Sequence, residues 1–170
     1  MKHQTSKSLV LSAMIAALYV VLSFLSNAFG LASGAIQIRI SEALTILPYF
    51  TPAAIFGVTI GCLLFNLLSG SAILDVIFGA IATLLGALLT YLIRKPAKKI
   101  KWMRFLLPIP PILSNALIVP WVLKTAYGLS DAYWYLFFTV GFGEIISCGV
   151  LGMILFFSLL PIQRYLFKNE

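Results

Sequence analysis

Few side chains in this sequence could carry chemistry, and the carboxylates are the most informative of them. Apart from the terminal Glu170, they are Glu42, Asp75, Asp131 and Glu144. Glu144 lies about 12 residues into a long apolar run, which is ~18 Å along a helix. An ionisable group at that depth of a membrane costs on the order of 3 kcal/mol, so it normally faces a partner or a polar interior. Glu144 is therefore a candidate binding residue, and a structural pair with a neighbouring helix is the alternative.

Two amides and one base extend the candidate set. Asn66 is expected near the outer end of one apolar run and Asn115 inside another, where each could bind a ligand or hydrogen-bond between helices. Arg39 and Lys124 are the bases expected on the outer side, and the carboxylates there outnumber them. This balance favours a substrate with a cationic amine and hydrogen-bonding edges over an anion. The candidate substrate-binding residues are Glu144, Asn115, Asp75, Glu42, Arg39 and Asn66.

The residues that several kinds of catalysis require are missing. His3, the single histidine, lies at the N-terminus, so no histidine-based metal site or catalytic triad can be built. No glycine precedes a lysine, so the chain has no P-loop motif, and any ATP hydrolysis needs another subunit. We expect no enzyme, no metal site and no cofactor. Cys62 and Cys148 fall within apolar runs and are predicted to pack in the core rather than to form a disulfide.

The composition indicates what surrounds these residues. Hydrophobic residues make up 61% of the chain and charged residues 10%, with a mean hydropathy of +1.04. Soluble domains are about half apolar and about a quarter charged. A chain of 170 residues cannot hide this much apolar surface from water, so lipid is the expected solvent. We predict a single multi-pass domain over residues 1–170 in a bacterial plasma membrane, and the clustering of the net charge of +7 argues against nucleic acid as a partner.

The apolar runs and the basic residues together predict six membrane crossings. Ten of the twelve basic residues lie at the N-terminus, in residues 94–104 and at the C-terminus, and such clusters mark the cytoplasmic side. An even number of crossings must separate them, so the short 42–52 segment must cross at least in part, although a full span needs about 20 residues. We predict an all-α bundle of six transmembrane helices with both termini in the cytoplasm and a short extended segment at 36–40. The predicted helices are 8–27, 42–52, 53–68, 73–93, 105–123 and 132–160.

Two further patterns leave alternatives open. Ala13 and Ala17 are one turn apart, and small residues at that spacing let another helix approach closely, either inside the bundle or from a partner protein. Aromatic residues gather at the expected outer ends of the last two helices. They could form an interfacial belt or stack on a flat heterocycle. These residues are Trp121, Tyr127, Tyr133, Trp134 and Tyr135.

The chain also resembles a known family of transport proteins. The alanine motif of the first helix and the basic loop at 94–104 are similar to those of the S components of energy-coupling factor (ECF) vitamin transporters. The sequence IQIRISEALTILP at residues 36–48, followed by YFTPAA, resembles the QueT-type branch, which is associated with queuosine precursors. The resemblance covers essentially the whole chain.

The resemblance implies a function and partners. An S component binds a micronutrient from outside and docks on a membrane coupling protein that rests on two ATPase subunits. Ala13 and Ala17 would contact the coupling protein, and the ligand would be queuine or a related 7-deazaguanine held in the region of the candidate residues. The alternatives are an S component for another vitamin, such as a pyridoxine or thiamine form, and a self-sufficient secondary carrier with Glu144 as its proton relay.

Overall fold

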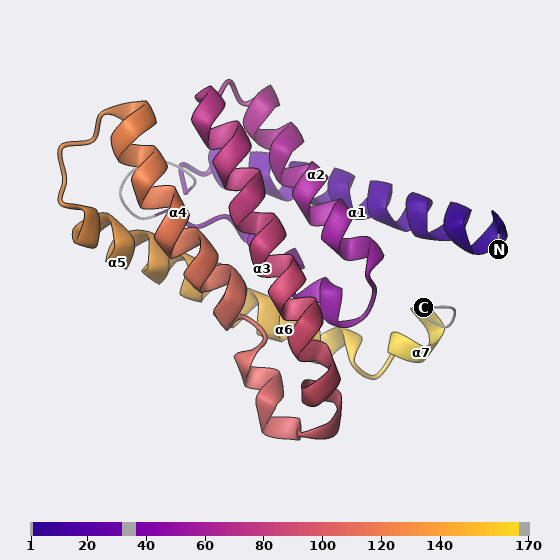
Figure 1. The fold of residues 1–170 in the computed structure, drawn as a ribbon. Helices are drawn as coiled ribbons and strands as arrows, with labels where there is room; N and C mark the ends of the chain where they lie inside the picture. The colour runs from indigo at the N-terminus through magenta and orange to yellow at the C-terminus, as the bar shows by residue number, and fades with distance from the viewer. Residues whose placement is uncertain (1, 32–36, 167–170) are drawn as a thin grey trace.

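The structure is a computed structural model, and it describes residues 2–31 and 37–166. These residues are almost entirely helical and form no strand (Figure 1), which confirms the predicted all-α class. Elements η1 and η2 are 3₁₀-helices and η3 is a π-helix. In chain order the elements are α1 (Lys2–Ala28), η1 (Ile40–Tyr49), α2 (Ala53–Leu68), α3 (Ile73–Lys99), η2 (Lys101–Leu106), α4 (Ile109–Tyr127), α5 (Tyr133–Glu144), η3 (Ile145–Leu151), α6 (Gly152–Leu159) and α7 (Gln163–Leu166).

Four segments are long and apolar enough to cross a membrane: Ser6–Ala28, Ile73–Lys99, Lys101–Tyr127 and Tyr133–Leu159. They correspond to the predicted spans 8–27, 73–93, 105–123 and 132–160. Helix α2 is also apolar but has 16 residues, or ~24 Å at 1.5 Å per residue. The last span is not one uniform α-helix. It consists of α5, the π-helix η3 and α6, which follow one another without a break. The protein is a multi-pass membrane protein.

The predicted 42–52 segment differs most from an ordinary span. Element η1 has ten residues, and at about 2.0 Å per residue it covers ~20 Å of the ~30 Å hydrocarbon core. Residues 41–49 are all buried, and η1 packs against α1, α2, α3, η3 and α6. It therefore lies inside the bundle, away from lipid. Of the predicted extended segment 36–40, Arg39 has an extended backbone, as expected. Ile40 instead begins η1, and residue 36 lies outside the described residues.

Close helix packing depends on a few glycines. A Cβ placed on Gly61 of α2 would lie 2.7 Å from Cβ of Tyr19 on α1, and one on Gly86 of α3 would lie 2.6 Å from Cα of Pro111 on α4. Such distances are below any normal contact, so only glycine permits these approaches. The first contact brings the fully buried Tyr19 into the core of the bundle, and the second seats α4 along α3.

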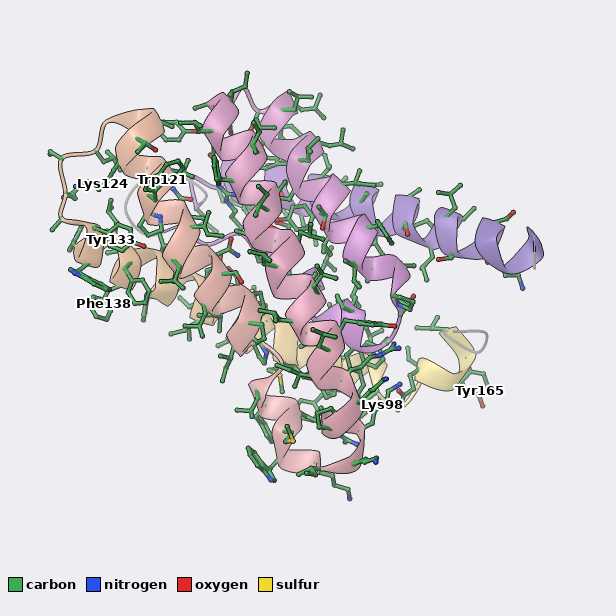
Figure 2. The ribbon with its side chains drawn as sticks, viewed as in Figure 1. Lys98, Trp121, Lys124, Tyr133, Phe138 and Tyr165 are labelled. Carbon is green, nitrogen blue, oxygen red and sulfur yellow. The ribbon has the colours of Figure 1, made fainter. Side chains whose placement is uncertain are left out.

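The molecule has two recognisable ends. The start of α1 and helix α7 lie on the same side in Figure 1. In Figure 2, Lys98 and Tyr165 lie toward that end, and Trp121 and Lys124 lie toward the other. Lys98 is exposed at the end of α3, next to the ring of Tyr49 at 5.7 Å from its centroid. The basic loop and the helix that ends the described chain are therefore on the same side as the N-terminus of α1.

Candidate functional site

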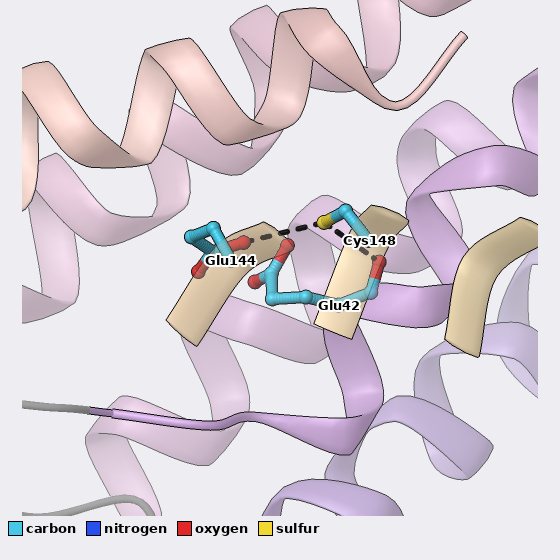
Figure 3. A group of neighbouring side chains, drawn as sticks. All are labelled: Glu42, Glu144 and Cys148. Carbon is cyan, nitrogen blue, oxygen red and sulfur yellow. Dashed lines mark hydrogen bonds between the residues drawn. The ribbon is translucent and has the colours of Figure 1, made fainter. Parts of the chain in front are cut away.

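Two carboxylates and a thiol meet in the core of the bundle. Glu42 of η1, Glu144 of α5 and Cys148 of η3 bring one ligand atom each to within 4.8 Å of one another (Figure 3). The sulfur of Cys148 lies 3.2 Å from Oε2 of Glu144 and 3.4 Å from the backbone oxygen of Glu42. All three residues are buried, with 1%, 6% and 1% of their surfaces exposed. Such a group can accept hydrogen bonds from a polar ligand, and its ligand types are also ones that bind divalent cations.

The last membrane segment is distorted where it supplies these groups. Glu144 is the final residue of α5, and the π-helix η3 follows it directly. Short π-helical stretches occur often at functional sites because they redirect side chains within a helix. Here Ser147 and Cys148 are buried together with Glu144. Gly143 is required as well, because a Cβ there would lie 2.0 Å from the backbone oxygen of Gln37, where the chain leading to η1 crosses α5.

The carboxylate of Glu42 is only half satisfied. Its Oε1 accepts a hydrogen bond from the hydroxyl of Tyr19 and a longer one, 3.4 Å, from Thr83. Its Oε2 has no hydrogen-bond partner within the described part of the chain. The amide of Asn115 lies beside both Glu42 and Glu144, yet its Nδ2 makes no hydrogen bond to any described residue.

The buried hydroxyl of Ser147 likewise has no hydrogen-bond partner within residues 2–31 and 37–166. Each buried polar group left without a partner costs about 1–3 kcal/mol, and native proteins contain few of them. An acceptor, an N–H donor and a hydroxyl that are all unpaired in one region indicate a place for a polar ligand.

A second polar group lies where α2 and α3 meet. Nδ2 of Asn66 donates to the backbone oxygen of Asp75 at 3.2 Å, and the hydroxyl of Tyr127 donates to Oδ2 of Asp75 at 3.0 Å. Oδ1 of Asn66 has no partner among the described residues. Gly70 has φ +73° in the turn between the two helices, a conformation that favours glycine, and this turn sets the two side chains next to each other.

The two groups are connected through the core. Cys62 lies 3.7 Å from Nδ2 of Asn66 and also lies beside Tyr19 and Thr83, which both contact Glu42. Arg39 interacts electrostatically with both Asp75 and Glu42 and so links the two groups. We call this connected set the polar band. It contains all six residues predicted to bind substrate, although their role in binding remains a prediction: Glu144, Asn115, Glu42, Arg39, Asn66 and Asp75.

The sequence did not predict which candidate residues are neighbours, and it missed others. The proximity of the carboxylates of Glu42 and Glu144 appears only in the structure. Tyr19 and Thr83 were not expected in the site, and nothing distinguishes them from other residues of apolar runs. Ser147 and Cys148 were identifiable, because positions i+3 and i+4 from Glu144 share its helix face.

The remaining polar and aromatic candidates lie outside the polar band. Asp131 is exposed, and its backbone oxygen accepts a hydrogen bond from Lys124. Trp134 and Tyr135 are 64% and 53% exposed at the start of α5, as expected for an interfacial belt. Two hollows of about 450 and 400 Å³ lie along α3 and α4, and Leu117 and Ile118 line both. The first is almost wholly apolar, which suits lipid chains, and the second is also lined by the aromatic rings of Phe78, Trp121 and Tyr133.

The fold and its core define a class of protein, a multi-pass helical membrane bundle with unpaired polar groups buried between its helices. Comparison with known proteins makes this assignment specific. The family model of the QueT transporter matches residues 9–161. The chain belongs to the QueT transporter family, and it is a transporter rather than an enzyme.

A curated relative agrees with the family match. The queuosine precursor transporter QueT of Lactococcus lactis subsp. cremoris (strain MG1363) is 40% identical over 84 residues, which is 49% of this chain and 49% of that protein. The matched region therefore spans about half the length of the relative. No solved structure gives a significant match.

The Tyr19 hydroxyl is predicted to stabilise the empty site. Tyr19→Phe leaves Oε1 of Glu42 with only the long contact to Thr83, so it should cost about 1–3 kcal/mol. For a protein of this size this lowers the melting temperature by about 2–12 °C. Thermal unfolding of the detergent-purified protein without ligand measures the change. Tyr91→Phe is the control, because that hydroxyl meets Arg94 at the half-buried edge of the bundle. Equal melting temperatures for the two variants would contradict the prediction.

Proposed function

We propose that this protein is the substrate-binding S component of an ECF-type, ATP-driven importer and that it binds a queuosine precursor, queuine or a related 7-deazaguanine, from outside the cell. Membership of the QueT family and the printed name of the relative support the substrate class. The observation that carries the proposal is the set of unpaired buried groups around Glu42, Asn115 and Glu144.

The chemistry of a 7-deazaguanine matches these groups. Its ring N–H and exocyclic amine are adjacent donors, which a carboxylate such as Glu42 or Glu144 can accept side by side. Its carbonyl oxygen is an acceptor for the free Nδ2 of Asn115. A base without one of these groups would leave a buried partner unpaired at a cost of about 1–3 kcal/mol, which gives selectivity.

Glu144→Gln tests the binding site directly. The amide keeps the shape but replaces two acceptors with one acceptor and one donor, so the dissociation constant should rise about 10- to 150-fold, equivalent to about 1.5–3 kcal/mol. Calorimetric titration with queuine and its aminomethyl precursor measures this. Asp131→Asn is the matched control, because Asp131 is exposed and lies outside the polar band. Wild-type affinity for both ligands in a folded Glu144→Gln protein would remove Glu144 from the site.

We further propose six crossings with both termini in the cytoplasm. Lys98 at the end of α3 and Tyr165 of α7 lie toward one end of the molecule and Lys124 toward the other (Figure 2), and clustering of basic residues at one end agrees with the positive-inside rule. Helix α2 is short and η1 is shorter, but η1 lies inside the bundle, where surrounding helices rather than lipid meet its backbone. Such short segments are tolerated at membrane depth when protein surrounds them.

Single cysteines test this topology after Cys62 and Cys148 have been replaced. Lys98, at the end of α3, and Ser130, in the loop between α4 and α5, are both exposed and lie on opposite sides of the proposed bundle. An impermeant thiol reagent added to intact cells should label Ser130→Cys and leave Lys98→Cys unlabelled until the cells are permeabilised. Labelling of position 98 in intact cells would overturn the six-crossing arrangement.

The first helix supports docking on a coupling protein. Ala13 and Ala17 are exposed, whereas Tyr19 on the opposite side of α1 is 0% exposed and packs in the bundle. The two alanines therefore do not fill the interior of the bundle. They lie among exposed apolar side chains such as Val10 and Met14, and small residues on such a face permit close approach of a partner helix.

Bulky residues at these positions should separate transport from binding. We expect Ala13→Leu or Ala17→Leu to abolish uptake in cells and to leave ligand affinity of the purified protein within about twofold, because the polar band lies on the other side of α1. Ala28→Leu, an exposed alanine at the far end of α1, is the control. Proportional loss of binding and uptake would contradict docking at this face. Uptake into liposomes without any ATPase subunit would show a secondary carrier instead.

A further inference from the structure

We propose that Asn66 and Asp75 form a distinct subsite of the polar band, which binds a protonated amine on a side arm of the base and so selects among bases with the same ring. This inference rests on the proposed function, because it assigns one part of the same ligand. It concerns the end of the polar band next to Tyr127, away from Glu144.

The orientation of the Asn66 amide leaves an acceptor free. The backbone oxygen of Asp75 can only accept a hydrogen bond, so the group that faces it at 3.2 Å must be Nδ2 of Asn66. Oδ1 then points elsewhere, and it has no partner in the described part of the chain although Asn66 is 0% exposed. A buried carbonyl oxygen of this kind needs an N–H or O–H donor.

Asp75 adds a carboxylate to this acceptor. A Cβ on Gly79 would lie 2.9 Å from Nδ2 of Asn66 and 3.4 Å from Oδ1 of Asp75, so the glycine at 79 allows both polar groups to pack closely against α3. The hydroxyl of Tyr127 holds the other carboxylate oxygen, Oδ2, at 3.0 Å. Asp75 is 6% exposed and is therefore a fixed, largely dry acceptor.

The charges and the hydrogen-bonding types favour a cation here. The polar band contains the carboxylates of Glu42, Asp75 and Glu144 and one guanidinium, that of Arg39. At the Asn66 end the side-chain oxygens of Asn66 and Asp75 are acceptors, whereas the Glu144 end offers acceptors together with the N–H donor of Asn115. An ammonium group has three donors and no acceptor, so it matches the Asn66 end. A neutral nitrile has only an acceptor and does not.

Three bases with one ring and different arms test the subsite: 7-deazaguanine, its 7-aminomethyl derivative and its 7-cyano derivative. We expect the wild-type protein to bind the aminomethyl base about tenfold or more tightly than the other two. Asp75→Asn and Asn66→Ala should each remove most of this preference and leave the affinity for 7-deazaguanine within about twofold. The variants lie on different helices, so if one fails to fold the other decides. Asp131→Asn should change none of the three affinities.

The other results each have a clear reading. Equal loss of all three affinities in both folded variants would show a structural role for Asn66 and Asp75 and overturn the subsite. If the wild-type protein binds the cyano base more tightly than the aminomethyl base, the subsite proposal is also wrong. That result would indicate that Arg39 donates a hydrogen bond to the 7-substituent. If the wild-type protein binds none of the three bases, the proposed function itself fails. That failure is visible before any variant is measured.

Discussion

The close approach of Glu42 and Glu144 inside the membrane is the constraint on which the rest of the core depends. Their ligand atoms lie within 4.8 Å of each other, and two ionised groups at this separation repel by about 3 kcal/mol even at an effective dielectric constant of ~20. Donors from three other places reduce this cost: Tyr19 on α1, Thr83 on α3 and Cys148 on η3. The helices must therefore converge on η1, which explains why this short segment is buried on all sides. The proposed ligand carries both donors and an acceptor, which match the acceptor of Glu42 and the donor of Asn115 that the described residues leave unpaired.

The sequence predicted the position of a residue where that position follows from its distance along the chain from the start of a helix or from a turn. Glu144 was placed deep in the last membrane segment by its distance from the start of an apolar run, and it is buried there. Asn66 and Asp75 are nine positions apart across a glycine turn, so their proximity also follows from local structure. The position of Glu42 does not, because it depends on a 3₁₀-helix packed among five other elements. The even number of crossings between the basic clusters required the 42–52 segment to enter the membrane. That argument gives no information on which helices surround the segment.

The residues that sequence analysis missed are those whose role arises from tertiary contacts. Tyr19 reaches Glu42 because Gly61 allows α1 and α2 to approach, and no local pattern around Tyr19 indicates that contact. The π-helix η3 has neither an unusual composition nor a proline, so nothing local marks the change from α5. The crossing of Gln37 over Gly143 likewise pairs positions more than a hundred residues apart. Glycines at such crossings indicate close approach only after the partner is known.

Helix α1 connects the proposed docking face with the site. One side of it carries the exposed Ala13 and Ala17, and the other carries the buried Tyr19, whose hydroxyl holds Glu42. Ser12 and Ser23 on that buried side also bond to neighbouring segments, to the backbone of Ala53 at 2.8 Å and to Ser41 of η1 at 2.7 Å. A shift of α1 against η1 would therefore stretch the Tyr19–Glu42 and Ser23–Ser41 hydrogen bonds together. Because a hydrogen bond weakens steeply as its geometry departs from the optimum, a partner that moved α1 would alter the carboxylate on which ligand binding is proposed to depend. Partner binding at the exposed face of α1, which carries Ala13 and Ala17, can therefore change the geometry of the polar band through this helix alone, without rearrangement of α3 or α4.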